Sequence, residues 1–233
     1  MLRPFFSFYG SKWRAAPLYP APQCDTVIEP FAGSAGYSLR HYRRDVRLYD
    51  VDPCIVGVWE YLIRTPRAEI ERLPLLQAGQ DVRDLPVCPE AQALIGFWCN
   101  RATVTPGRTL SRWALTGPRP HLHWGDFARS RIAEQVDKIR HWSVTLGSYE
   151  SVDPVFATWF VDPPYVDKGR HYRYNCRSID FGALGEWCST RPGQVIVCEQ
   201  AGADWLSFEP LAAIKARSGK SSEVIWTRSA DSR

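Results

Sequence analysis

The tetrapeptide Asp162-Pro163-Pro164-Tyr165 directly follows the most apolar stretch of the chain, residues 155–161. Two consecutive prolines fix φ and remove two N–H donors, so the chain should leave a strand here in a stiff, extended turn. The Asp162 carboxylate and the Pro163 carbonyl would then form an acceptor-only surface beside the exposed aromatic face of Tyr165. Such a surface suits a planar base with an exocyclic amine, which donates two N–H bonds. We therefore predict that these four residues are catalytic and polarise an amine toward an electrophile. A turn that only ends an edge strand explains the prolines but not all four residue types.

The segment Phe31-Ala32-Gly33-Ser34-Ala35-Gly36 begins at the end of a short buried strand that we expect at residues 25–31. Glycines let a ligand approach the backbone closely, and they leave amide groups free at the start of a helix that we expect to open at Tyr37–Tyr42. The spacing matches neither Gly-x-Gly-x-x-Gly nor a P-loop. The segment indicates a ligand-binding turn, although a tight turn without a ligand has the same composition.

Asp50 lies near the end of another expected strand, residues 47–52, about 20 residues beyond the glycines. Nucleoside-binding folds place an acid there to accept hydrogen bonds from ribose hydroxyls. The alternative role is to cap the helix that begins at Pro53, and Asp52 fits that role better. We therefore assign ribose binding to Asp50 and capping to Asp52.

Strands and helices alternate along much of the chain. Further strands are expected at 142–146, 155–161, 194–198 and 222–227, and helices at 53–62, 89–100, 132–139 and 181–189. This alternation predicts an α/β fold, a Rossmann-like doubly wound and mostly parallel sheet. Ligands of such sheets bind beyond the carboxyl ends of the strands, where all three groups of residues described above are expected.

The alternation is interrupted between Pro74 and Gly125, a stretch with six prolines and one credible helix. We predict a small, mainly helical inserted subdomain at residues 75–125. Residues 1–74 and 126–233 would form the catalytic domain.

Composition limits the classes of protein further. The chain of 233 residues is 45% hydrophobic and 23% charged, with seven scattered cysteines and no Cys-x-x-Cys pair. These values indicate a globular protein that needs no metal or disulfide, and we expect it in a reducing cytoplasm. No apolar run is long enough to cross a membrane, and the first residues do not resemble a secretory signal.

Positive charge is concentrated in two segments. Residues 91–131 contain six arginines and one acid, and residues 165–177 contain four basic residues and one acid. Arginine binds phosphates and base edges through a planar fork. A GC-rich genome would also raise the number of arginines relative to lysines, but it would not explain why they cluster in two segments.

The chain resembles the Dam-type family of N6-adenine DNA methyltransferases, which use S-adenosylmethionine (SAM). The resemblance covers most of the chain, and its motifs occur in the family's order. It rests on these stretches: Phe8-Tyr9-Gly10-Ser11-Lys12, Glu29 to Ser34, Tyr49 to Asp52 and Phe160 to Tyr165, with Arg173-Tyr174-Asn175 and Ser222 to Trp226 similar to phage-like members.

The resemblance implies a set of SAM-binding residues. Phe8, Tyr9 and Lys12 would close the pocket, Phe31, Gly33 and Ser34 would line it, Asp50 would hold the ribose, and Asp162 would contact both cofactor and target amine. One departure concerns the Asp-Phe pair with which the family binds the cofactor adenine. Here Ser148 and Tyr149 occupy the position expected for that pair. Gly125-Asp126-Phe127 contains an Asp-Phe pair, but it lies before a predicted helix and so too early in the chain.

The resemblance also implies DNA as the partner. The target adenine would be flipped out of the duplex against Tyr165. The basic residues expected to contact DNA are Arg101, Arg108, Arg112, Arg119, Lys168, Arg170 and Arg173. We expect a monomer or weak dimer, in a bacterial or phage-infected cytoplasm. Three alternatives stay open: methylation of a guanine amine in RNA, methylation of a protein glutamine, and a SAM- or DNA-binding module without catalysis.

Overall fold

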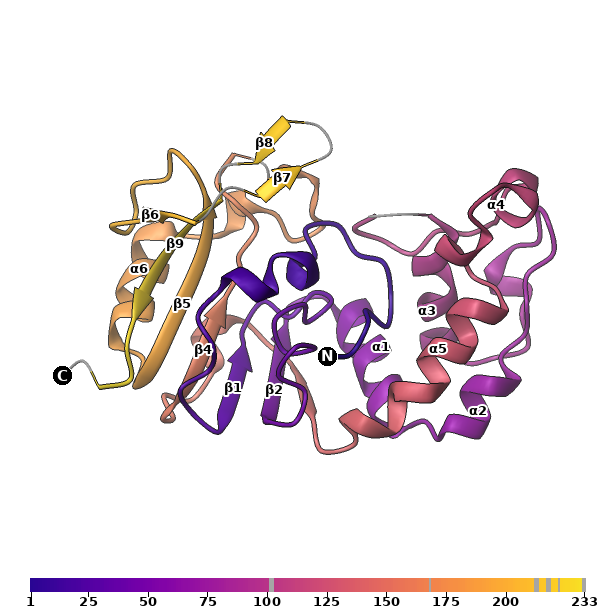
Figure 1. Cartoon of the computed structure of the whole chain (residues 1–233), viewed down its shortest axis with the longest axis horizontal. Coiled ribbons are helices and arrows are strands. Elements are labelled where there is room, and N and C mark those ends of the chain that lie inside the picture. Colours follow the sequence, from indigo (N-terminus) through magenta and orange to yellow (C-terminus); the bar gives the residue numbers. More distant parts are fainter. Residues whose placement is uncertain (101–102, 168, 212–213, 217–218, 222, 232–233) are drawn as a thin grey trace.

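A mostly parallel sheet runs through the computed structural model, which describes residues 1–100, 103–167, 169–211, 214–216, 219–221 and 223–231. Within these residues the sheet has seven strands in the order β3-β2-β1-β4-β5-β9-β6 (Figure 1). The five parallel strands are β1 (Thr26–Glu29), β2 (Asp45–Asp50), β3 (Ser143–Leu146), β4 (Ala157–Val161) and β5 (Gly193–Gln200). The antiparallel strands are β9 (Glu223–Arg228) and β6 (Glu209–Pro210), while β7 (Ile214–Ala216) and β8 (Gly219–Ser221) form a separate hairpin. The predicted α/β fold with a mostly parallel sheet is confirmed.

Both faces of the central strands are covered, which explains their nearly continuous apolar sequences. Because successive side chains of a strand point to opposite faces, Trp159 and Val161 of β4 join one hydrophobic cluster and Phe160 joins the other. The first cluster includes Leu184 and Cys188 of α6 (Phe181–Thr190). The second extends over α1 (Pro53–Arg64) into the helical part of the chain. The sheet is therefore doubly wound.

The remaining helices lie together at one end of the molecule, away from α6 and the C-terminus (Figure 1). They are α2 (Arg67–Arg72), α3 (Pro89–Cys99), α4 (Arg112–Thr116) and α5 (Asp126–Val136). Residues of α3 share a core with the N-terminal segment: the rings of Phe97 and Phe6 are 5.0 Å apart, and Trp98 Nε1 donates to the Phe5 carbonyl at 2.9 Å. The start of the chain is thereby fixed against the predicted insertion.

The expected helix at Tyr37–Tyr42 is wrong, because this segment forms a series of turns. Arg40 N–H donates to the Tyr37 carbonyl and His41 N–H to that of Ser38, three residues back in each case. The Ser38 N–H is taken by the buried carboxylate of Glu29 at 2.7 Å, a side-chain acceptor that competes with a helical hydrogen bond. The turns keep the segment close to the end of β1.

Candidate functional site

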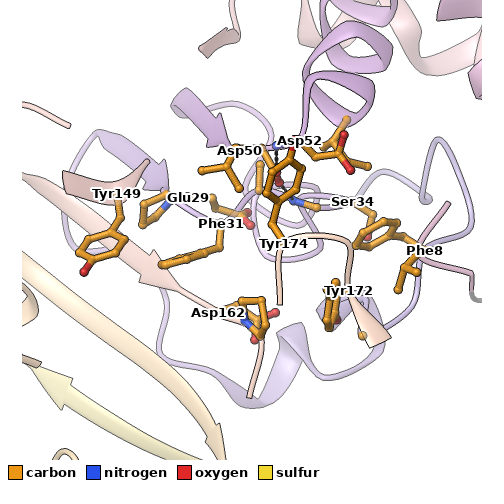
Figure 2. A pocket seen from close by; sticks show the side chains of 18 of the residues that line it. Phe8, Glu29, Phe31, Ser34, Asp50, Asp52, Tyr149, Asp162, Tyr172 and Tyr174 are labelled. Carbon is orange, nitrogen blue, oxygen red and sulfur yellow. Dashed lines mark hydrogen bonds between the residues drawn. The ribbon is translucent and has the colours of Figure 1, made fainter. Parts of the chain in front are cut away.

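The carboxyl ends of β1, β2 and β4 lie side by side, since β1 is between β2 and β4 in the sheet. The segments that follow these ends enclose a cavity of about 440 Å³, within the size range of small-molecule sites. In Figure 2, Phe31 and Tyr149 lie on one side of this cavity, Phe8 and Tyr172 lie on the other, and Asp162 lies between them. We call it the first cavity.

The glycine-containing turn after β1, residues 31–36, forms one wall of the first cavity together with Phe8–Lys12, which we call the N-terminal motif. Gly33 has a φ of 45°, in the left-handed region that favours glycine. A Cβ atom at Gly36 would lie 2.5 Å from the backbone nitrogen of Trp13, so only glycine lets the two segments approach this closely. The hydroxyls of Ser34 and Ser11 are hydrogen-bonded at 2.8 Å. Of the residues named here, Ser11, Gly33, Ser34 and Gly36 line the first cavity, and Trp13 does not.

Asp50 holds the same turn in place from the end of β2. Its carboxylate accepts hydrogen bonds from the backbone N–H groups of Gly33 and Asp52, both at 2.9 Å. Burial raises the pKa of Asp50 to about 6, although these two hydrogen bonds act in the opposite direction. Asp52 caps α1, as predicted, by accepting from the Cys54 N–H at 2.9 Å. A carboxylate has about four acceptor positions, so Asp50 can still accept from a ligand hydroxyl.

Asp162 forms an ion pair with Lys12, with 2.7 Å between Oδ1 and Nζ. Burial raises the pKa of Asp162 to about 6, while the Lys12 ammonium acts to lower it. Burial also acts to lower the pKa of Lys12, but Asp162 and Glu223 outweigh it and raise that pKa above its ordinary value. The pair joins the N-terminal motif to the end of β4.

Tyr165 differs from the exposed ring that the sequence suggests. It is half-buried, its hydroxyl donates to Glu223 Oε1 at 2.7 Å, and the Lys12 ammonium lies 4.7 Å from the centre of its ring. The same Glu223 oxygen accepts from the Tyr19 hydroxyl at 2.6 Å. The ring keeps this position because a buried carboxylate needs hydrogen-bond donors and a buried ammonium needs anions or an aromatic face.

A second cavity, of about 870 Å³, adjoins the first at Asp162. Pro163 and Tyr165 line it, whereas Pro164 lines the first cavity. The residues that line both cavities are Phe8, Tyr9, Gly10, Ser11, Lys12, Asp162 and Tyr172. Asp162 therefore borders both cavities, with its Oδ1 atom buried.

The segment after β3 adds the aromatic wall of the first cavity. The rings of Tyr149 and Phe31 are stacked, with centres 5.6 Å apart. Ser148 lies beside Glu150, and both line the cavity. Asp126, in contrast, begins α5 and pairs with Arg129 at 2.6 Å. The structure thus puts the Ser148-Tyr149 stretch, and not Asp126, next to Asp50.

Acidic residues predominate on the wall of the first cavity. Among the described residues, those that line it are Glu29, Asp50, Asp52, Glu150, Asp162 and Asp180, against the cations Lys12 and Arg173. Burial raises the pKa of Glu29 to about 8. Such a cavity suits a ligand with positive charge and hydroxyl groups, and it disfavours phosphates.

The basic residues expected to contact DNA are dispersed. Arg101 and Lys168 lie outside the described residues. Arg108 is bound to Asp81, with 2.5 Å between Nη2 and Oδ2, and Arg112 lines a separate hollow with Trp113. Arg119 and Arg170 are exposed, whereas Arg173 lines the first cavity, 4.0 Å from Asp52.

Several lining residues received no prediction from sequence. They are Glu29, Glu150, Tyr172, Tyr174 and Glu223. Glu29 and Tyr174 fall within motifs of the family resemblance, which was a usable signal. Glu223 also falls within such a stretch, but its place beside Lys12 and Tyr165 could not be predicted, because it depends on β9 lying next to β5.

No family model and no curated protein matches the chain. Two solved structures with a similar course of the chain are a conserved hypothetical protein of Streptococcus pyogenes and the rRNA methyltransferase AviRa of Streptomyces viridochromogenes. The first is 8% identical, with a TM-score of 0.40 over 89% of this chain and 88% of the other. The second is 14% identical, with a TM-score of 0.43 over 97% and 87%. With TM-scores below 0.5, neither likeness bears on the activity.

The described part of the chain has neither a metal-binding cluster nor a membrane-spanning helix. It contains no cluster of three or more His, Cys, Asp or Glu side chains placed to hold a metal ion. None of its helices has the length and apolar character needed to cross a bilayer.

Proposed function

We propose that this protein is a SAM-dependent methyltransferase that methylates the exocyclic N6 amine of adenine in DNA. The observation that carries the proposal is the place of Asp162, whose carboxylate lies where the two cavities meet. A direct transfer needs its donor and acceptor in such adjoining sites, within reach of one group that orients the amine.

The residues of the first cavity fit SAM. Asp50 is placed to accept from ribose hydroxyls, and the stacked rings of Phe31 and Tyr149 offer an apolar wall for the adenine. Ser148 and Glu150 supply acceptors beside that wall. When bound, SAM supplies a methyl group on a positively charged sulfur, and the acidic lining favours that charge.

Asp162 would act on the target amine from the second cavity. Its carboxylate accepts an N–H of the amine and stabilises the positive charge that develops on nitrogen as the N–C bond forms and the S–C bond breaks. The sulfur keeps the electron pair of the broken bond, and the nitrogen gives up one proton. With a pKa of about 6, Asp162 is a suitable first acceptor for that proton.

Mass spectrometry after incubation with SAM tests the proposal, with mixed-sequence duplex DNA, RNA and protein as separate substrates. N6-methyladenine should appear in DNA alone, and Asp162→Ala should reduce its formation by at least about 10²-fold. Methylation of RNA alone or of protein alone would show that DNA is not the substrate. Unchanged turnover in the Asp162→Ala variant would show that Asp162 takes no part in the reaction. SAM binding measured by calorimetry separates a loss of chemistry from a loss of the cofactor site.

A further inference from the structure

The lining of the second cavity combines cations with aromatic rings from distant parts of the chain. Arg131 is half-buried and Trp98 is buried, while the other two arginines and Phe127 are exposed. The N-terminal segment contributes Arg3 and Arg14, α3 contributes Trp98, and α5 contributes Phe127 and Arg131. His121, from the short turn before α5, completes it. We call these six residues the rim.

Four rim residues form a continuous series of planar groups. The guanidinium of Arg131 lies 4.9 Å from the ring centre of Trp98 and 5.6 Å from that of Phe127, and the Phe127 and His121 rings are 5.8 Å apart. Phe127 is 56% exposed, although it is large and apolar. Nucleic-acid bases stack on such rings and on arginine planes regardless of sequence.

The charge of the rim is positive. Arg3 and Arg14 are exposed, and neither has an acidic side chain among the described ion pairs. The acids that line the second cavity, Asp162 and Glu223, lie deeper and are bound to Lys12 and to tyrosine hydroxyls. A polyanion that approaches the opening therefore meets uncompensated arginines.

Arg108 and Arg112, two of the arginines at 75–125, lack these features. Arg108 is neutralised by Asp81, and Arg112 belongs to a hollow that does not share a lining residue with the second cavity. A nucleic-acid strand bound at Arg108 or Arg112 would not be brought to Asp162 by that contact.

We propose that the rim, and not the arginines of the insertion, binds the nucleic-acid strand that carries the target base. Arg3 and Arg14 contact phosphates, and Phe127 with Arg131 stacks against the bases that flank the target. The inference rests on the proposed function, because it takes the second cavity as the place of the target base.

Fluorescence anisotropy with a labelled DNA duplex tests the inference without requiring turnover. Arg3→Ala and Arg14→Ala should each weaken binding and reduce the slope of log K against log salt by about 1. Phe127→Ala should weaken binding by roughly 5- to 150-fold, the effect of losing one base–aromatic stack. Arg131 is left intact because it also binds the Pro4 carbonyl.

Two variants serve as references. Arg67→Ala removes an equal charge from α2, where the side chain is exposed and paired with Glu71, and it should leave DNA binding unchanged. Arg112→Ala represents the insertion and should also leave binding unchanged. The melting temperature and the SAM affinity of each variant show that the fold and the first cavity are intact.

Normal DNA binding by the Arg3, Arg14 and Phe127 variants, or a larger loss with Arg112→Ala, would overturn the inference and leave the proposed function standing. Failure of the unaltered protein to bind DNA overturns both. Loss of binding in the rim variants without any methyl transfer by the unaltered protein would keep the rim as the DNA-binding surface, but it would overturn the proposed function and with it the assignment of a target base to the second cavity.

Discussion

At the scale of single residues, the site is organised around charges that water hardly reaches. Lys12 lies between two carboxylates, 2.7 Å from Asp162 and 3.7 Å from Glu223, and against the ring of Tyr165. Removing one partner of such a group leaves the other charge uncompensated, which is costly. The properties of Asp162 therefore depend on side chains far from it in sequence.

Replacing Lys12 by methionine should shift the pH dependence of methyl transfer. The ammonium lowers the pKa of Asp162, so its loss should raise that pKa from about 6. If the carboxylate is the active form, the acidic limb of the profile of kcat against pH moves to higher pH by about one unit or more. Lys138→Met, at an exposed position after α5, is the control. An unmoved acidic limb would contradict the coupling.

Replacing Tyr165 by alanine should reduce kcat/KM for DNA much more than SAM affinity, because the ring lines the second cavity and not the first. Tyr165→Phe keeps the ring and loses only the hydrogen bond to Glu223, at roughly 1.5–3 kcal/mol of stability. Kinetics alongside calorimetry separates the two effects. Equal losses of SAM affinity and of kcat/KM in the alanine variant would contradict the assignment of the ring to the second cavity alone.

At the scale of elements, the first cavity is made by strand ends and by the close approach of two loops. Six of the nine described strands, α1 and the fold class could be predicted, because apolar runs, Asp52 and Pro53 are strong local signals. The turns at 37–42 could not, since the carboxylate that captures the Ser38 N–H belongs to β1. The second cavity was equally inaccessible: its rim joins the N-terminal segment, α3 and α5, and only tertiary packing brings these together.

Gly36→Ala should separate the glycine-containing turn from the N-terminal motif. Its Cβ atom would lie 2.5 Å from Trp13 N and 2.8 Å from Lys12 N, both in rigid backbone. We expect a lower melting temperature and at least about tenfold weaker SAM binding, equivalent to roughly 1.4 kcal/mol. Gly125→Ala is the matched control, because it has extended backbone and open space around its Cβ position. Equal SAM affinities of the two variants would refute this account.

At the scale of the whole molecule, several buried acids make stability depend on pH. Burial raises the pKa values of Asp50 and Asp162 to about 6 and that of Glu29 to about 8. Each is raised above its value in the unfolded chain, so its contribution is complete below about pH 4 and is lost as pH rises through the folded-state value. These groups therefore favour the folded state in mild acid over alkaline solution.

Glu29→Gln should flatten this dependence between about pH 4.5 and pH 8, the range between the unfolded-state and folded-state pKa values of Glu29. Glutamine can still accept the Ser38 N–H, but it has no charge to bury. Above pH 8 we expect the variant to have the higher melting temperature. The corresponding gain in the free energy of unfolding is on the order of a few kcal/mol. Thermal denaturation between pH 5 and 9 measures this, with Glu134→Gln at an exposed position of α5 as the control. Parallel curves would show that Glu29 does not titrate in this range.

The hydrogen bond between Tyr19 and Glu223 joins residues 204 positions apart, and β9 reaches its place only by pairing with β5. During synthesis, Lys12 and Asp162 leave the ribosome well before Glu223 does. A nascent chain therefore lacks the anion that holds both tyrosine hydroxyls until β9 has been translated and has paired with β5.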